Sequence, residues 1–419
     1  MRRAVVAMAA VAAVACSWGE FDDLRDGAPV EVLDRPGLIT SGFGTTIAAA
    51  GPTSGLLLLG GFPGQAGVVV LDLNQRTRPE RNLCEDPTRC RLVGSPVAVP
   101  DRQDGQGCFL FGVGAGVDGL GPDVGLLGGC ASGTSFKLPL PGALATLLQQ
   151  ALFANSGPRV FMNVLSMASS GASFAIGSPD LQRATLVVGT QAGVEVAPPA
   201  DEPGFAASLA LADDGKGQRV LAVGSPGLGQ VRFFDGDTKG VTPRACVRRG
   251  GSYGVTMRGL VDGPRRLVVV SDAAGLVEVI DPGKLPVSPS CMEPPAEAVV
   301  DTFHCIDGDV VKGCDAAAFG YALDAVDIDR DGHPEVIVGA PGLNVRDRVN
   351  AGAMMVFPID AASDEGRPLY LPSADDNDRL GSALAVVAIE GKLAVATSAL
   401  DHEKLVLFTC VKPGGEGCP

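Results

Sequence analysis

The sequence predicts an all-β fold, a seven-bladed β-propeller of four-stranded antiparallel blades with one inserted helix. The composition supports this prediction, because 57 glycines, 31 prolines and 46% hydrophobic residues with only 19% charged ones are typical of short buried strands joined by turns. A chain of 419 residues is also long for one compact core unless the fold is a repeat. A similar order of strands and turns recurs seven times, at about 45 to 65 residues each, which leaves room for four short strands.

The repeated unit is clearest from residue 319 onward. It consists of Phe319-Gly320, an alternating strand, a turn, an apolar strand that ends in Gly339-Ala340-Pro341, and a third strand at 353–357. The units begin near residues 43, 95, 161, 205, 253, 319 and 380. Their strands alternate or are apolar throughout, as expected when each sheet is packed between two others. The segment VEVLD, residues 30–34, is expected to supply the outer strand of the seventh blade and so close the ring.

Residues 141–157 depart from the strand pattern. Their apolar positions recur at helical spacing between a proline and a glycine. These positions are Leu144, Leu147, Leu148, Ala151 and Leu152. The segment is predicted to be an amphipathic helix inserted between the second and third blades, with its leucine face packed on the propeller; docking of a partner is the alternative.

The Phe-Gly and Gly-Ala-Pro pairs resemble those of the FG-GAP repeat family, and the resemblance covers about residues 30–410. In this family, which includes the N-terminal domain of integrin α subunits, such repeats build a seven-bladed propeller. The resemblance implies a propeller domain at 30–410, followed by a tail at 411–419. Family members meet their ligands on the face opposite the calcium turns, which here would include residues 342–352 and 282–318.

Carboxylates alternate between the first two strands of the sixth unit. A hard dication prefers about six to eight oxygen ligands, and alternate residues of a tight turn point their side chains at one centre. The family places a calcium loop, D-x-D-x-D-G-x-x-D, at this point, so the resemblance implies Ca²⁺ as a cofactor. The expected ligands are the side chains of Asp327, Asp329 and Asp331, the backbone carbonyl of His333, and the carboxylate of Glu335, which stands where aspartate is usual.

Two other interpretations fit a loop of this composition. The same spacing begins an EF-hand, but that motif needs a glutamate at its twelfth position, which is Val338 here, inside an apolar strand. The second interpretation is an acidic, solvated turn without an ion. The segments at 213–215 and 101–105 lack the alternating carboxylates and are predicted to be ordinary turns. The acidic run Asp375, Asp376 and Asp378 lies in a connection and not in the metal turn, and it is predicted to be a solvated loop.

The first sixteen residues, MRRAVVAMAAVAAVAC, combine a basic start, a short apolar run and a small-residue ending. They predict a signal peptide at 1–15 and an N-terminal tether at 16–29. An ordinary signal peptidase could cut after Ala15. Alternatively, residues 13–16 resemble a bacterial lipobox, in which Cys16 is lipidated. No later segment is long and apolar enough to cross a membrane, so the lipid would be the sole membrane anchor.

Eleven cysteines leave ten when Cys16 is set aside, and an even number in an exported protein indicates disulfides. The spacing proposes pairs between neighbours, although the connectivity stays open. These pairs are Cys84 with Cys90, Cys108 with Cys130, Cys246 with Cys291, Cys305 with Cys314, and Cys410 with Cys418.

The net charge and the positions of the histidines exclude some classes of function. The net charge of −15, without a basic stripe, argues against nucleic acid as a partner. None of the three histidines, His304, His333 and His402, lies in a nucleophile or metal motif. The sequence therefore favours a non-enzymatic binding or adhesion module for a protein or glycan, held by lipid at the cell envelope, on the outer membrane or cell surface. An exported lyase or hydrolase acting on polysaccharide is the alternative, because paired carboxylates are recognised in space rather than in sequence; a purely structural role is the third possibility.

Overall fold

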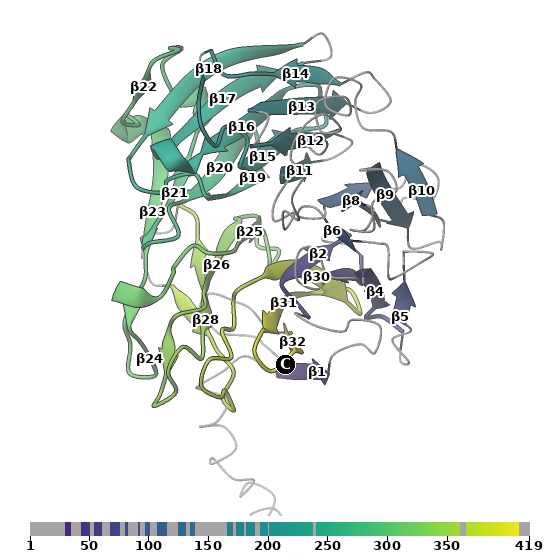
Figure 1. Cartoon of the computed structure of the whole chain (residues 1–419). Coiled ribbons are helices and arrows are strands. Elements are labelled where there is room, and N and C mark those ends of the chain that lie inside the picture. The colour runs from purple at the N-terminus through teal and green to yellow at the C-terminus, as the bar shows by residue number, and fades with distance from the viewer. Residues whose placement is uncertain are drawn as a thin grey trace, which may run out of the picture.

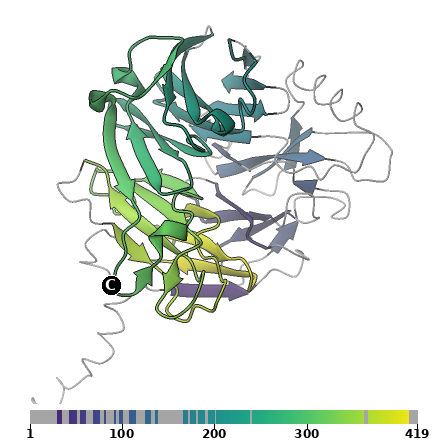
Figure 2. The same cartoon turned by 60° about the vertical axis from the view of Figure 1, so that its left-hand side comes forward.

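The fold consists of strands and short turns. The computed structural model describes residues 30–34, 43–50, 54–60, 68–75, 80–82, 91–92, 97–100, 107–114, 125–130, 135–138, 166–170, 173–179, 182–188, 193–199, 201–237, 240–360 and 366–409. Across these ranges the helical residues are confined to single 3₁₀ turns, so the all-β prediction is confirmed. Figure 1 shows the strands grouped into sheets that lie side by side, and Figure 2 shows the same grouping from another side.

The first three sheets follow the order of the chain. The first contains β2 (Thr46–Ala49), β3 (Leu56–Gly60), β4 (Val68–Asp72) and β5 (Glu80–Asn82). The second contains β6 (Arg91–Leu92), β7 (Val97–Pro100), β8 (Gly107–Gly114), β9 (Gly125–Cys130) and β10 (Ser135–Leu138). The third contains β11 (Ser166–Ser170), β12 (Ser173–Ser178), β13 (Arg183–Val188) and β14 (Val194–Val196).

The next three sheets carry longer connections. The fourth contains β15 (Ser208–Asp213), β16 (Arg219–Ser225), β17 (Gln230–Gly236), β18 (Val241–Arg248) and β22 (Cys291–Met292). The fifth contains β19 (Thr256–Asp262), β20 (Arg265–Ser271), β21 (Leu276–Ile280) and β23 (Val299–His304). The sixth contains β25 (Leu323–Val326), β26 (Glu335–Ala340), β28 (Ala353–Pro358) and β29 (Arg367–Leu369). Beside it, β24 (Val311–Lys312) pairs with β27 (Asn344–Val345). The 3₁₀ turns are η1 (Pro226–Leu228), η2 (Pro282–Lys284), η3 (Ala296–Ala298) and η4 (Cys314–Ala316).

The seventh sheet joins the two ends of the described chain. It contains β30 (Leu384–Ile389), β31 (Lys392–Ala399), β32 (Lys404–Phe408) and, on the far side of β32, β1 (Val30–Asp34). β1 runs antiparallel to β32, with Val30 opposite Phe408 and Asp34 opposite Lys404. The prediction that VEVLD completes the last sheet is confirmed. This pairing covers an edge that would otherwise present unpaired backbone groups to other chains.

The first strands of the sheets contact one another in a cycle. The contacts run from β2 to β7, β11, β15, β19, β25 and β30 in turn, and from β30 back to β2. Each of these strands begins a few residues after a unit start expected from the sequence. The core lies between successive sheets: one hydrophobic cluster joins the fourth and fifth sheets, and another joins the seventh and first. β3, β16 and β26 are buried at every position, as expected for strands covered on both faces.

Glycine is required where one sheet approaches the next. Gly320, directly after the fully buried Phe319, has a φ of +87°, and a β-carbon there would lie 1.9 Å from Ser271 Oγ at the end of β20. The next pair of sheets repeats this contact, since a β-carbon on Gly339 would lie 2.1 Å from the carbonyl oxygen of Gly381. The Phe319-Gly320 pair, and Leu380-Gly381 in the same place of the seventh sheet, therefore pack on the end of the second strand of the sheet before. This gives both glycines of the repeated motif a physical role.

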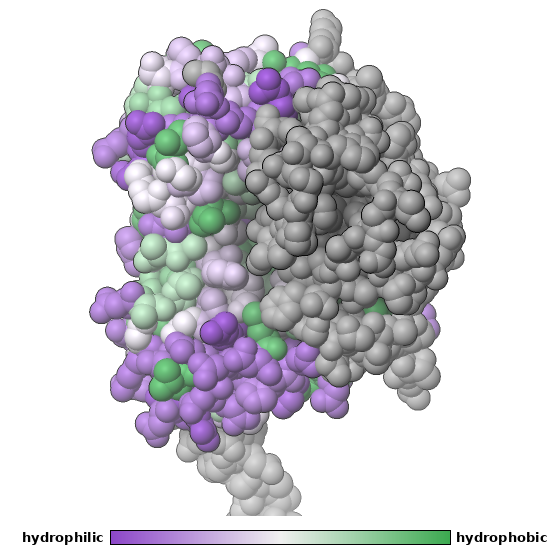
Figure 3. Space-filling model, viewed as in Figure 1, coloured by the Kyte–Doolittle hydropathy of each residue, from purple (hydrophilic) through white to green (hydrophobic). Residues whose placement is uncertain are grey.

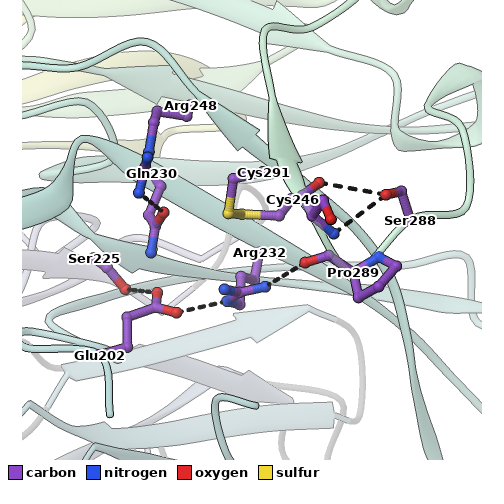
Figure 4. The surroundings of a disulfide bond; sticks show 10 residues. Glu202, Ser225, Gln230, Arg232, Cys246, Arg248, Ser288, Pro289 and Cys291 are labelled. Atoms are coloured by element: carbon purple, nitrogen blue, oxygen red, sulfur yellow. Dashed lines mark hydrogen bonds and ion pairs between the residues drawn. A yellow bond between two sulfur atoms is a disulfide. The ribbon is translucent and has the colours of Figure 1, made fainter. Parts of the chain in front are cut away.

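Two sheets contain a fifth strand, beyond the four expected from the sequence. In the fourth sheet this strand is β22, which comes from the connection between β21 and β23 and pairs parallel to β18. The Cys246–Cys291 disulfide fixes the contact, and Arg232 donates a hydrogen bond to the carbonyl oxygen of Pro289 in the same connection (Figure 4). The connection thus fastens the fifth sheet to the edge of the fourth. A long-range link of this kind leaves no periodic signal in the sequence.

Two of the expected disulfides are confirmed, Cys246–Cys291 and Cys305–Cys314. The β8–β9 register places Cys108 opposite Cys130. The predictions for residues 1–29 including Cys16, for the helix at 141–157, for Cys84, Cys90, Cys410 and Cys418, and for the tail at 411–419 lie outside the described residues. Within the described ranges, no helix has the length and hydropathy needed to span a bilayer.

Candidate metal centre

In the acidic turn between β25 and β26, aspartate side chains accept hydrogen bonds from backbone N–H groups of the same turn. Asp327 accepts hydrogen bonds from two backbone N–H groups, that of Asp331 at 3.0 Å on Oδ1 and that of Gly332 at 3.0 Å on Oδ2. Asp329 Oδ1 also accepts from the Asp331 N–H, at 3.2 Å. Gly332 has a φ of +97°, a conformation that side chains disfavour, so glycine permits the sharp bend. The turn brings carboxylates that are separated in sequence to one point.

Three carboxylates converge there. One oxygen from each of Asp327, Asp329 and Glu335 lies within 4.8 Å of the others. Glu335 is the first residue of β26 and is only 1% exposed, and its Oε2 accepts one hydrogen bond, at 2.8 Å, from the Ile328 N–H. Within the described part of the chain, no other three histidine, cysteine, aspartate or glutamate side chains come as close.

The electrostatics of this cluster are unfavourable without a cation. Burial raises the pKa of Glu335 from 4.5 to about 8, and the negative charges of Asp329, Asp331 and Asp327 add to the increase. The hydrogen bond from Ile328 acts in the opposite direction but does not cancel it. A buried carboxylate beside other carboxylates is stabilised by a positive charge. The donor set consists of oxygen atoms alone, which fits a hard divalent ion better than zinc or copper.

Only some of the predicted calcium ligands lie close together in the structure. Asp327, Asp329 and Glu335 meet as expected. Asp331 does not join their group; its Oδ1 accepts a hydrogen bond from the His333 N–H at 2.8 Å. The participation of Asp331 and of the His333 carbonyl therefore stays a prediction.

The other acidic segments bind groups of the protein itself. Asp213 is buried and forms an ion pair with Arg219, at 2.7 Å between Oδ2 and Nε. In the acidic run before β30, Asp376 accepts from the Val349 N–H at 3.0 Å, while the buried Asp378 contacts His402 Nδ1. Asp375 and Asp376 are exposed, as expected for a solvated loop, whereas Asp378 is buried and ties the loop to its neighbours.

Sequence reasoning missed Asp324, a buried carboxylate three residues before the turn. Its Oδ1 forms an ion pair with Arg258 Nε of β19 at 2.8 Å, and its Oδ2 accepts from the Val386 N–H of β30 at 3.0 Å. It thus joins the first strand of the sixth sheet to those of the fifth and seventh. The sequence feature that could have identified Asp324 was an acidic residue within a strand expected to be buried on both faces.

Comparison with known protein families gives a match over the region that contains the acidic turn. Residues 319–353 match the FG-GAP repeat family, a span that runs from Phe319 through the acidic turn to the first residue of β28. A human protein, phosphatidylinositol-glycan-specific phospholipase D, is 30% identical over 101 residues. The match covers 21% of this chain and only 12% of that relative's length.

Solved structures resemble the fold over most of the chain. A chain of the mitotic checkpoint complex has a TM-score of 0.55 at 12% identity, and the match covers 92% of this chain and 93% of that one. Virginiamycin B lyase from Staphylococcus aureus has a TM-score of 0.51 at 7% identity, with 91% and 99% covered. Raptor from Chaetomium thermophilum has a TM-score of 0.53 at 11% identity, with 94% and 30% covered. At these identities the likeness concerns the fold alone. The protein thus has an all-β, β-propeller-like fold and contains an FG-GAP repeat.

Proposed function

We propose that this protein is an exported, lipid-anchored β-propeller of seven blades that binds Ca²⁺ and acts as a binding module for a protein or glycan, without enzymatic activity. The blade number is supported by the cycle of contacts among seven first strands and by the β1–β32 pairing. Export is supported by the two disulfides, which persist in oxidising compartments.

The observation that carries the calcium proposal is the buried carboxylate of Glu335 beside Asp327 and Asp329. The fourth sheet offers an internal comparison. Arg219 is the first residue of β16, as Glu335 is of β26, and its guanidinium neutralises the buried Asp213. In the sixth sheet this position carries a carboxyl group instead, so a positive charge that neutralises the ionised cluster would have to come from solution. Carboxylate ligands in a turn of this size suit Ca²⁺, which tolerates irregular oxygen cages better than Mg²⁺ does.

The role of the ion is structural. It neutralises the turn between β25 and β26, and it is expected to hold that turn rigid. A ligand that binds only the folded state raises the free energy of unfolding, by about 2.7 kcal/mol when its concentration is a hundred times its dissociation constant.

Calcium titration of the purified protein tests this proposal. Isothermal titration calorimetry and thermal unfolding would be measured with Ca²⁺ and with chelator, on the wild type and on Asp329→Asn. Asp315→Asn removes an exposed carboxylate outside the cluster and serves as the matched control. We expect the wild type and Asp315→Asn to bind one ion and to unfold at higher temperature with Ca²⁺, and Asp329→Asn to lose both effects. Equal melting temperatures with Ca²⁺ and chelator for the wild type would refute the proposed role.

The binding role is assigned to the surface opposite the calcium turn, where long connections of the fifth to seventh sheets meet. The polysaccharide-acting enzyme, the alternative, has one observation in its favour, the raised pKa of Glu335, because shifted carboxyl groups often mark active sites. The same group lies within the proposed metal cage, which accounts for the shift without catalysis. Incubating the protein with cell-envelope polysaccharides and measuring release of reducing or unsaturated ends separates the two proposals.

A further inference from the structure

The sheets have two distinct ends. In the sixth sheet Val326, Glu335 and Pro358 lie side by side at the end that carries the acidic turn. Ion pairs join the turns of successive sheets at this end, from Arg266 of the fifth sheet to Asp214 of the fourth and from Arg265 of the fifth sheet to Asp360 of the sixth. We term this end the turn face; in the fourth to seventh sheets it consists of residues 213–219, 262–265, 281–284, 326–335, 358–360 and 389–392.

The opposite end is built from the long connections. They are residues 305–318, 342–352, 371–380 and 400–403, termed the connection face. Hydrogen bonds knit these segments together: the Asn377 N–H donates to the carbonyl oxygen of Val349 at 2.8 Å, and the Leu400 N–H donates to that of Asp378 at 2.8 Å. The β24–β27 pair and the Cys305–Cys314 disulfide tie in the first segment.

Both ends of the described chain lie at the turn face. β32 starts after residues 400–403 on the connection face and runs away from it. Its last residue, Phe408, lies opposite Val395, three positions past the start of β31 at the turn between β30 and β31. Because Val30 is opposite Phe408, the chain enters the fold from the turn face as well. Strand direction alone fixes this arrangement.

Exposed charge is distributed unequally between the two faces. The connection face carries seven exposed acids, Asp307, Asp309, Asp315, Asp347, Asp375, Asp376 and Asp401, against four exposed cations, Lys312, Arg346, Arg348 and Arg379. On the turn face of the fifth to seventh sheets, three exposed acids, Asp331, Asp360 and Glu390, are matched by three exposed cations, Lys284, Arg330 and Lys392. Figure 3 shows hydrophilic side chains gathered on the part of the surface where β24 lies. An anionic bilayer would repel the connection face more strongly.

We infer that the turn face is the membrane-facing side of the lipid-anchored protein and that the connection face points away from the bilayer. This inference rests on the proposed lipidation of Cys16. Thirteen residues separate Cys16 from Val30, and they reach at most about 45 Å when fully extended. Because the tether joins the fold at Val30 on the turn face, that face lies nearest the lipid, and the opposite face reaches the bilayer only if the tether is stretched along the side of the fold. The charge distribution acts in the same direction.

The partner of the turn face is thus the lipid surface itself, while a soluble or cell-bound ligand would have free access to the connection face. The calcium turn lies on the membrane side. It is therefore expected to support the anchored end of the fold, with ligand contact left to the connection segments.

Photo-crosslinking of the full-length lipidated protein tests this orientation. A diazirine analogue of lysine would replace Lys392 on the turn face or Lys312 on the connection face, both of which are exposed. Each protein is reconstituted into vesicles of phosphatidylethanolamine and phosphatidylglycerol and irradiated, and lipid adducts are quantified by mass spectrometry. The Cys16→Ala protein, mixed with the same vesicles, gives the background.

We expect lipid adducts at position 392 to exceed those at position 312 at least fivefold, and both to fall to background with Cys16→Ala. Equal adducts at the two positions, or an excess at position 312, on a protein whose Cys16 carries lipid would overturn the orientation and leave the anchor intact. A protein whose Cys16 carries no lipid by mass spectrometry would overturn the anchor and, with it, the orientation.

Discussion

Gly320→Ala tests whether the sheets are held together by the close approach of glycine to the preceding sheet. The φ of +87° disfavours alanine by about 1 kcal/mol. In addition, the new β-carbon would lie 1.9 Å from Ser271 Oγ and 2.9 Å from Ser271 Cβ, so the buried Ser271 hydroxyl must rotate away and the two strands must also move slightly apart. Such overpacking costs about 1–3 kcal/mol, and the sum is about 2–4 kcal/mol of unfolding free energy. This is a large part of a typical domain's stability but leaves the protein folded.

Gly250→Ala is the matched control for this variant. Gly250 has nearly the same φ, +85°, but a β-carbon there would meet nothing within 4 Å. It should therefore cost only the backbone contribution of about 1 kcal/mol. Urea unfolding followed by fluorescence or circular dichroism, with calcium held constant, measures both variants at an unchanged m-value.

A second change separates the two contributions within one site. Ser271→Gly removes both Ser271 atoms that the new β-carbon would meet most closely. In the double variant, Gly320→Ala should cost at least about 1 kcal/mol less than it does alone, a coupling typical of residues in contact. If Gly320→Ala and Gly250→Ala destabilise equally and the double variant shows no coupling, the glycine serves the local backbone only, and the inter-sheet explanation fails.

Three further outcomes are expected. In the metal-free fold the pKa of Glu335 is about 8, against 4.5 in the unfolded chain, so between these two pH values the folded state keeps a proton that the unfolded state loses. The contribution of this group to the free energy of unfolding in chelator should therefore be largest below pH 4.5 and fall as the pH rises towards 8. Glu335→Gln should flatten this pH dependence, as measured by urea unfolding. Glu335→Arg should place a guanidinium beside the aspartates, as Arg219 does beside Asp213, so that chelator no longer changes the melting temperature; a persistent calcium effect would contradict this. Replacing both cysteines of the 246–291 pair by serine should cost about 4 kcal/mol, against about 2.5 kcal/mol for the 305–314 pair, because the first closes a loop of 45 residues and the second one of 9; denaturant unfolding that reverses this order would disprove the loop-entropy explanation.

Much of the architecture follows from local patterns. The unit starts were readable because an aromatic-glycine pair precedes an apolar strand in the first, fifth and sixth units, with Phe205 and Leu380-Gly381 in the same place in the fourth and seventh, and the first strands begin just after these positions. The place of β1 was also predictable, because one strand was missing from the last unit and one was left over before the first. The segment 30–34 had the right composition to fill the gap.

The fifth strand of the fourth sheet was not predictable. β22 is two residues long, and it pairs with β18 through a disulfide between positions 45 residues apart. The cysteine spacing proposed this bond correctly but gave no indication that the connection would extend a neighbouring sheet. Which edge a long connection reaches depends on packing between blades, and no periodicity records it.

The candidate metal centre was likewise predictable from the sequence only in part. The alternating aspartates identified the turn, yet their hydrogen bonds with its backbone select which of them converge: Asp327 and Asp329 do, and Asp331 instead accepts a hydrogen bond from the His333 N–H. Asp324 escaped notice because its partners, Arg258 and Val386, lie more than 60 residues away in opposite directions along the chain. Asp324 is buried whereas Arg258 is half exposed, so the loss of either partner contact would leave a buried carboxylate less well compensated, and the contacts favour one stacking of the three strands.

The sequence by itself determined the repeated unit, the all-β class and the turn at which carboxylates accumulate, because strand periodicity, glycine at tight approaches and ligand spacing are properties of neighbouring residues. Only the tertiary structure decided the depth at which Glu335 is buried, the inter-blade partners of Asp324, and the face from which the chain enters the fold. These depend on which surfaces meet when the sheets pack, and burial and charge pairing acquire their energies only at that stage.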